Sequence, residues 1–326
     1  MEAFRGDQVT GTRATFLQDA STLQRRALLS AGLAAAAGRP AFAANSALAD
    51  FETGAPPVQT PAHEGHVRVP GASLYYRDTG GSGDPLLLAH AGTGSALAWA
   101  YQQPVFAAAG YRVIAFSRRG YARTVVNDPA MPHNTLDDIE ALANQLQLGR
   151  FHALGTAAGG GIMLDYAVAH PDRVQSLIVA SAIGNIDDPA YRDAGQKMFP
   201  PAFHDLPIEL QELGPFYRAA NPEGTARWVA LVCQAGKSIP DSPRRKRTTW
   251  NEVARLAMPI LWMTGGADMF IPPPLLALFH QKTPGSEYVI ADNAGHSIYW
   301  ERPQFFNAAV LGFLGRHAKR QKPVPR

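Results

Sequence analysis

Residues 154–160 read LGTAAGG and stand between an apolar run at 150–155 and a helical pattern that ends at Pro171. Gly155 and Gly159 flank position 157 at equal spacing, and Ala157 occupies the centre. Glycine has no Cβ, so this spacing is typical of a strained turn that brings a strand close to a helix. The stretch therefore predicts a sharp strand-to-helix turn with Ala157 at its tip.

Strand and helix signals alternate on both sides of this turn. Residues 66–80 alternate as a hairpin does, 135–148 form an amphipathic helical pattern with Thr135 as the expected N-cap, and 302–317 read as a terminal helix. Short apolar runs predict further buried strands at 85–90, 111–117, 174–181, 258–265 and 286–292. Strands that alternate with helices predict an α/β fold, with a mostly parallel sheet covered by helices on both faces.

The first residues are expected to be an export signal rather than part of the fold. Arg25 and Arg26 precede a weakly apolar run of Leu, Ala and Gly, and small residues follow near Ala43 and Ala49. This pattern resembles a twin-arginine signal over residues 1–43, cleaved after Ala43 or Ala49, and predicts a periplasmic or secreted protein. A disordered leader without export is the alternative. The apolar run is too short to span a membrane.

Composition divides the remaining chain. Residues 44–66 are rich in proline and are expected to form a flexible linker. Regular patterns indicate a core over 67–184 and 251–318, and the irregular segment between them, 185–250, is expected to be a helical cap insertion. Residues 319–326 form a basic tail. The cap falls at the edge of the sheet where α/β folds bind their ligands.

Charge and cysteine content exclude some functions. The chain of 326 residues carries a formal charge of +3, but its basic side chains gather at 244–247 and in the tail without an aromatic platform. We therefore expect no nucleic-acid partner. The single cysteine, Cys233, lies in an apolar stretch and is predicted to be buried, so a disulfide framework is excluded. Nothing in the sequence specifies an oligomeric state.

Four further motifs follow the predicted strands in a fixed order. They are HAGTGS at 90–95, SRRGYART at 117–124, GGADMFIP at 265–272 and NAGHSIYWERP at 293–303. Together with the turn at 154–160, this order over residues 67–318 resembles the α/β-hydrolase family. The resemblance implies the α/β-hydrolase fold and activity on a small carbonyl substrate.

The resemblance also assigns roles to individual residues. Position 157 would carry the nucleophile, His296 would act as general base and acid, and Asp268 would orient the histidine. The backbone N–H groups of Gly92 and Ala158 would stabilise an oxyanion.

The nucleophile position departs from the family pattern. Ala157 has no hydroxyl, so an acyl-enzyme cannot form there. Thr156 should point away from the tip, and Ser181 ends the next predicted strand without a strained turn. Other departures occur at Ala91, and at Ser117, Ala122 and Thr124, where the family often has D-x-R-G-x-G-x-S.

Three interpretations remain open. The chain is a serine hydrolase whose serine was changed to alanine, or a natural branch in which His296 acts directly as a base on water or on a substrate C–H or O–H. The second includes lyase and isomerase chemistry, which the resemblance also implies. In the third, the protein binds a small apolar molecule without catalysis.

The substrate pocket is expected to be apolar. Trp99 follows the first motif, and the cap carries the other candidate binding residues: Phe199, Phe203, Phe216, Tyr217 and Trp228. His63 and His66 lie in the linker without an accompanying acidic cluster, so no metal site is expected. No phosphate-binding loop is present, and no cofactor is predicted.

Overall fold

The computed structural model describes residues 51, 54–236, 238–239 and 247–318. The expected export signal, the basic tail and most of the basic cluster at 244–247 lie outside these residues. No helix in the described ranges is long and apolar enough to cross a membrane.

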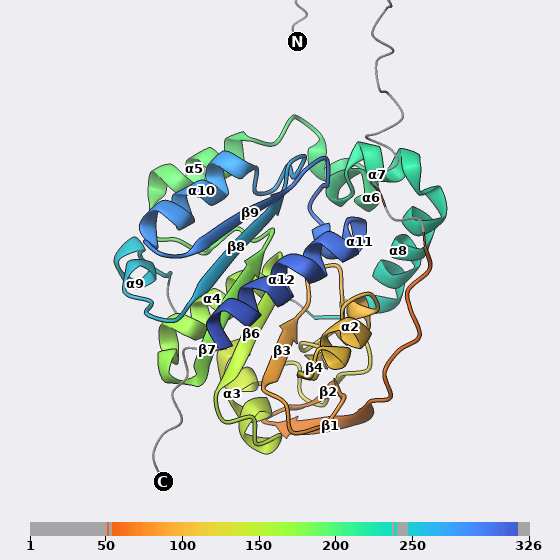
Figure 1. Ribbon diagram of the computed structural model, residues 1–326, viewed down its shortest axis with the longest axis vertical. Coiled ribbons are helices and arrows are strands. Elements are labelled where there is room, and N and C mark those ends of the chain that lie inside the picture. The colour runs from red at the N-terminus through yellow and green to blue at the C-terminus, as the bar shows by residue number, and fades with distance from the viewer. Residues whose placement is uncertain (1–50, 52–53, 237, 240–246, 319–326) are drawn as a thin grey trace, which may run out of the picture. The chain divides into compact units, whose positions relative to one another are not determined.

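One sheet organises the described residues, and it confirms the predicted α/β fold (Figure 1). Its strands are β1 (His63–Val69), β2 (Ala72–Asp78), β3 (Pro85–Ala89), β4 (Arg112–Phe116), β5 (Val125–Val126), β6 (Phe151–Thr156), β7 (Val174–Ala180), β8 (Ile260–Gly265) and β9 (Glu287–Ala291). The order is β1-β2-β4-β3-β6-β7-β8-β9, with β5 beside β2. In this spatial order, every neighbouring pair from β4 through β3, β6, β7 and β8 to β9 is parallel. The pairs β1–β2, β2–β4 and β2–β5 are antiparallel.

Helices cover both faces of this sheet. On one face α3 (Thr135–Gln145), α4 (Ala158–Ala169) and α10 (Pro273–Lys282) bury their apolar sides in one core cluster. On the other face α2 (Gln103–Ala108), α11 (Ile298–Glu301) and α12 (Pro303–Ala318) contribute to a second cluster. Burying both faces explains why β6 and β8 read as continuous apolar runs.

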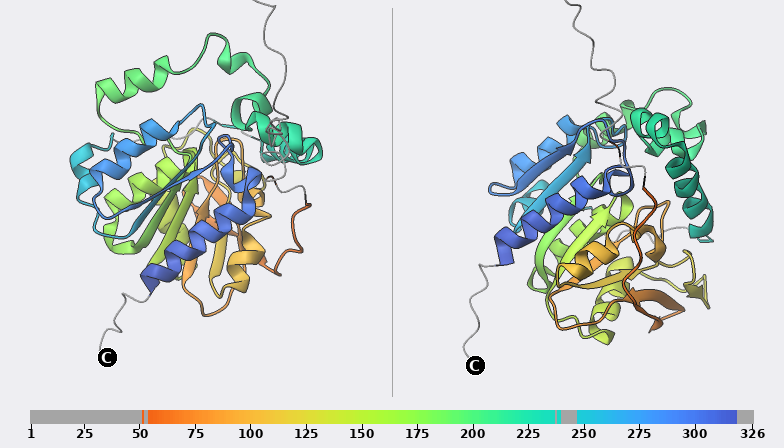
Figure 2. Two further views of the ribbon diagram at one scale, coloured as in Figure 1. Left: turned by 45° about the horizontal axis from the view of Figure 1, so that its top comes forward. Right: turned by 45° about the vertical axis from the view of Figure 1, so that its right-hand side comes forward.

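The segment between β7 and β8, predicted to be a cap insertion, is called the cap below and is seen in two views in Figure 2. It contains α5 (Pro189–Lys197), η3 (Phe203–Asp205), α6 (Ile208–Glu212), α7 (Pro215–Ala220) and α8 (Pro222–Ala235), and α9 (Trp250–Ala254) follows before β8. The indole of Trp300 on α11 donates to the Gly224 carbonyl of α8 at 3.2 Å. The cap is therefore joined to the loop and helix that carry His296.

The expected flexible linker is partly structured. β1 begins at His63, which pairs with Asp78 of β2, so four residues of that stretch belong to the hairpin. Upstream, Thr60 exchanges two hydrogen bonds with Gln103, at 3.0 and 2.7 Å. Backbone pairing and side-chain contacts thus order a segment whose proline content favoured a loose chain.

Two local predictions were wrong. Asn134, not Thr135, caps α3: its side chain accepts from the Leu136 N–H at 2.8 Å, so Thr135 becomes the first helical residue. Cys233 is exposed rather than buried. The buried positions of α8 include Trp228 and Ala235, one heptad apart, and Cys233 falls outside their face.

Candidate active site

The turn at 154–160 has the predicted strained geometry. β6 ends at Thr156, α4 begins at Ala158, and Ala157 between them has φ +50° and ψ −121°. A Cβ on Gly155 would lie 2.4 Å from the Gly159 carbonyl oxygen, and one on Gly159 would lie 2.2 Å from that of Ala89. Neither contact is sterically possible, so both glycines are required for the turn.

The two candidate oxyanion donors lie next to each other. A Cβ placed on Gly92 would be 4.0 Å from the Ala158 Cβ. Ala158 is the first residue of α4, so its N–H has no intrahelical acceptor, and the helix dipole favours negative charge there. The loop after β3 and the start of α4 thus meet where an oxyanion would be bound.

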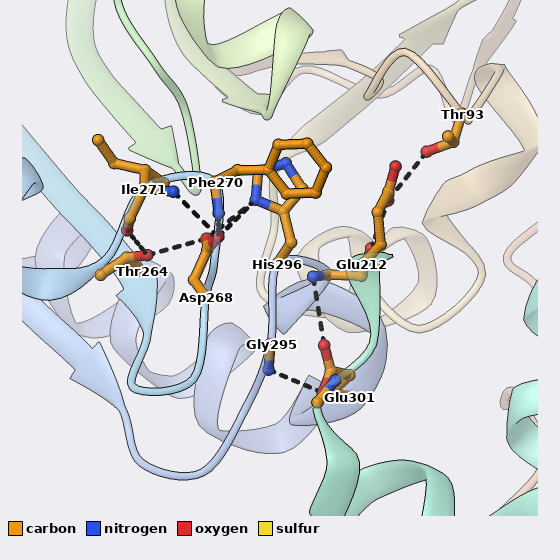
Figure 3. A network of polar contacts seen from close by, with 11 residues as sticks. Thr93, Glu212, Thr264, Asp268, Phe270, Ile271, Gly295, His296 and Glu301 are labelled. Atoms are coloured by element: carbon orange, nitrogen blue, oxygen red, sulfur yellow. Dashed lines mark hydrogen bonds and ion pairs between the residues drawn. The ribbon is translucent and has the colours of Figure 1, made fainter. Parts of the chain in front are cut away.

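Asp268 and His296 are brought together from two separate loops. The Nδ1 atom of His296 lies 2.9 Å from each carboxylate oxygen of Asp268 (Figure 3). Both residues are buried, with 6% and 3% of their surfaces exposed. This contact holds the imidazole with its Nδ1 toward the carboxylate, which leaves Nε2 for chemistry.

Asp268 is itself fixed by three donors. The Phe270 and Ile271 N–H groups donate to Oδ1 at 2.8 and 3.1 Å, and the Thr264 hydroxyl donates to Oδ2 at 3.0 Å. Burial acts to raise the pKa of Asp268, but the neighbouring His296 and these N–H groups lower it below its ordinary value. Asp268 is therefore an ionised partner for the histidine.

The charge around His296 makes it a stronger base. Burial acts to lower the pKa of His296, but the charge and hydrogen bond of Asp268 raise it above its ordinary value, with help from Glu212 and Glu301. Three acidic side chains thus stabilise the imidazolium that forms when His296 accepts a proton.

Sequence reasoning missed two of these acidic residues. Glu212 ends α6 in the cap and accepts hydrogen bonds from Thr93 and Ser297. Glu301 on α11 accepts from the backbone N–H groups of Gly214, Gly295 and Ser297. Burial raises the pKa of Glu301 to about 7, against the opposing effect of those N–H groups. The position of Glu301 inside the last motif was the only available signal for it.

The aromatic candidates separate into different environments. Phe199 and Phe203 stack at 4.9 Å between ring centroids and contact Phe270, whose ring lies 4.4 Å from that of His296. These two cap residues therefore belong to an aromatic cluster that reaches the histidine.

The remaining four candidates do not join that cluster. Trp228 lines a pocket with Thr93, and Trp99 lines a different one with Gln103. Tyr217 is buried against Phe51. Phe216, expected in the pocket, is 42% exposed, because neighbouring positions of the short helix α7 face different ways.

Ser181 differs from its expected backbone conformation. It has φ +47°, so it does lie on a strained turn, and its buried hydroxyl has no hydrogen-bond partner. The buried Thr156 hydroxyl is also unpartnered. His63 and His66 lie on β1, and in the described ranges no group of three or more potential ligands is arranged to bind a metal.

Known proteins resemble this chain over most of its length. A 2-hydroxy-6-oxononadienedioate/2-hydroxy-6-oxononatrienedioate hydrolase of Burkholderia vietnamiensis is 26% identical over 267 residues, which cover 74% of this chain and 91% of the relative. A Mycobacterium tuberculosis protein that carries the name non-heme bromoperoxidase BpoC is 26% identical over 255 residues, 73% of this chain and 96% of the relative.

A solved structure supports the same fold. The thermophilic esterase of Thermogutta terrifontis superposes with a TM-score of 0.65 at 21% identity, covering 79% of this chain and 99% of the esterase. The sequence profile of the alpha/beta hydrolase family matches residues 86–309, which include the turn at Ala157 and both members of the Asp268–His296 pair. The chain belongs to the alpha/beta hydrolase family.

Proposed function

We propose that the protein hydrolyses a small apolar ester, lactone or related carbonyl compound without a covalent intermediate. The observation that carries this proposal is the hydrogen bond between His296 and Asp268, which is complete although the neighbouring turn ends in alanine. The name of the Burkholderia vietnamiensis relative, a hydrolase of oxo compounds, supports hydrolysis of a small carbonyl compound.

His296 would activate water directly. Its Nε2 accepts a proton as the water oxygen bonds to the carbonyl carbon, and the Gly92 and Ala158 N–H groups stabilise the oxyanion. The carbonyl re-forms as the leaving oxygen departs with the proton from His296. Asp268 keeps the imidazole oriented and balances its charge during the step.

The acidic side chains around His296 favour a catalytic function over the binding of a ligand without catalysis. Asp268 holds the imidazole of His296 oriented and raises its pKa, which equips it to accept and return a proton, a property that binding alone does not require. The aromatic cluster of Phe199, Phe203 and Phe270 supports an apolar substrate.

The first test is His296→Ala, assayed on short-chain p-nitrophenyl esters and γ-lactones by product formation. Loss of the general base should lower turnover by about 10²-fold or more. His66→Ala, a change on the exposed part of β1, is the matched control and should retain turnover.

Three results would contradict the proposal. Equal turnover by wild type and His296→Ala would exclude the histidine as base. Stoichiometric binding of an apolar ester that stays intact would identify a binding protein instead. Elimination or isomerisation products that depend on His296 would assign the same base to a different reaction.

A further inference from the structure

The cap places a carboxylate against the two loops that form the site. Glu212, the last residue of α6, is 6% exposed. Its Oε2 accepts hydrogen bonds from the Thr93 hydroxyl at 3.1 Å and from the Ser297 hydroxyl at 3.2 Å. Thr93 follows the candidate oxyanion donor Gly92, and Ser297 follows His296. One carboxylate oxygen therefore joins the loops on either side of the reacting groups.

The backbone of Glu212 also contacts the histidine loop. Its carbonyl oxygen accepts from the His296 N–H at 2.7 Å. A Cβ on Gly295 would lie 2.7 Å from this same oxygen and 2.4 Å from the Gly214 nitrogen. The cap backbone is thus packed directly on the loop, and Figure 3 shows Glu212 beside His296. Such contacts fix the position of the histidine from outside the core.

We propose that Glu212 is a positioning residue that the cap supplies to the catalytic site, holding the Thr93 and Ser297 loops together and stabilising the His296 imidazolium. This proposal rests on His296 acting as the base. It assigns the cap a part in catalysis in addition to covering the substrate.

The electrostatics agree with this role. Burial raises the pKa of Glu212, while His296 and the hydrogen bonds from Thr93 and Ser297 act in the opposite direction. The titratable groups that act on it or respond to it are His296, Asp268 and Tyr299 of α11, and Glu301 of the same helix acts on His296. In return, the Glu212 carboxylate raises the pKa of His296. A base that acts on water without a serine gains from this added proton affinity.

Two variants separate the charge of Glu212 from its hydrogen bonds. Because both bonds reach the same oxygen, Glu212→Gln can keep them through its amide oxygen while the negative charge is lost. Glu212→Ala loses both the charge and the bonds. Glu209→Gln, on the same helix, removes an equal charge away from these contacts and is the matched control.

The readouts are kcat, KM and the pH dependence of kcat/KM on a turned-over ester, with the pKa of His296 followed by NMR. Glu212→Gln should lower kcat about tenfold and move the acid limb of kcat/KM to lower pH by about one unit, because a lost neighbouring charge lowers the pKa of His296. Glu212→Ala should lower kcat further, by about 100-fold. Glu209→Gln should match wild type in all three.

Distinct results overturn the proposal and the function on which it rests. If His296→Ala abolishes turnover but both Glu212 variants keep the wild-type kcat and acid limb, Glu212 has no positioning role. If both variants lower only the melting temperature, Glu212 merely anchors the cap. If His296→Ala leaves turnover unchanged, the proposed function fails first.

Discussion

The turn at Ala157 and the loop at His296 differ in what they contribute to the site. The turn retains its strained backbone and both essential glycines, yet its tip carries only a methyl group. The histidine loop retains its functional group and is held by Asp268, Glu212 and Glu301. A strained φ costs about 1–3 kcal/mol and usually persists where a site needs it. Here the strained turn joins the end of β6 to α4, which begins at Ala158 with an N–H that has no acceptor within the helix.

Restoring a hydroxyl at the turn should produce the largest effect on this comparison. Ala157→Ser is expected to raise ester turnover by about 10³-fold or more, because a serine at the tip can form an acyl-enzyme. Stopped-flow assays should then show an initial burst of product. Thr156→Ser keeps a hydroxyl one residue away and should show none. No gain from Ala157→Ser would contradict this expectation and show that the turn and His296 are not aligned for catalysis by a serine.

Weakening the histidine loop should produce the next largest effect. Asp268→Asn is expected to lower turnover by about 10²-fold or more, because the amide no longer stabilises the imidazolium. The Asp268 charge raises the pKa of His296, so this variant should also move the acid limb of the pH–rate profile to lower pH. Asp292→Asn, an exposed change after β9, is the control. An acid limb that stays in place would remove Asp268 from its assigned role.

The smallest expected effect concerns the contribution of Glu301 on α11 to stability. The pKa of Glu301 is about 7 in the folded protein, against an ordinary value of 4.5. A raised folded pKa stabilises the protein below the ordinary value, and that contribution is lost as pH rises through about 7. Glu301→Gln keeps one acceptor oxygen, enough for the Gly214 and Gly295 N–H groups that share Oε2. It should flatten the dependence of unfolding free energy on pH between 5 and 8, by up to about 3 kcal/mol.

Denaturant unfolding at pH 5 and pH 8 measures this difference. Glu287→Gln is a suitable comparison, because Arg316 lowers the pKa of Glu287 and the group stays ionised over the whole interval. The unfolding free energy of Glu287→Gln should therefore change with pH as that of the wild type does. Equal slopes for wild type and Glu301→Gln would show that the buried carboxylate does not titrate in this range.

Sequence patterns predicted the core well because the core obeys local rules. Apolar runs such as β3 and β8 are buried on both faces, and the glycines at 155 and 159 have one steric explanation. The order of the motifs then predicted that Asp268 and His296 act together. In the structure these two residues, 28 positions apart in sequence, are in contact. These features depend on neighbours in sequence or on a fixed strand order.

Burial in the cap was harder to predict because it depends on contacts between residues that are distant in sequence. Glu212 reads as a solvent-facing residue of a short helix, and only packing on residues 295–297 makes it part of the site. The predictions for Phe216 and Cys233 were wrong for a related reason: the orientation of each cap helix decides which of its sides is buried. The strained φ of Ser181 likewise has no local sequence signal.

The hydrogen bond from the His296 N–H to the Glu212 carbonyl has a consequence for protein engineering. Exchanging caps between members of a family is an obvious way to change which molecules they accept. In this protein such a graft would also replace a backbone acceptor of the reactive histidine. Residues 212–214 should therefore stay with the core in any chimera in which the rest of the cap is exchanged.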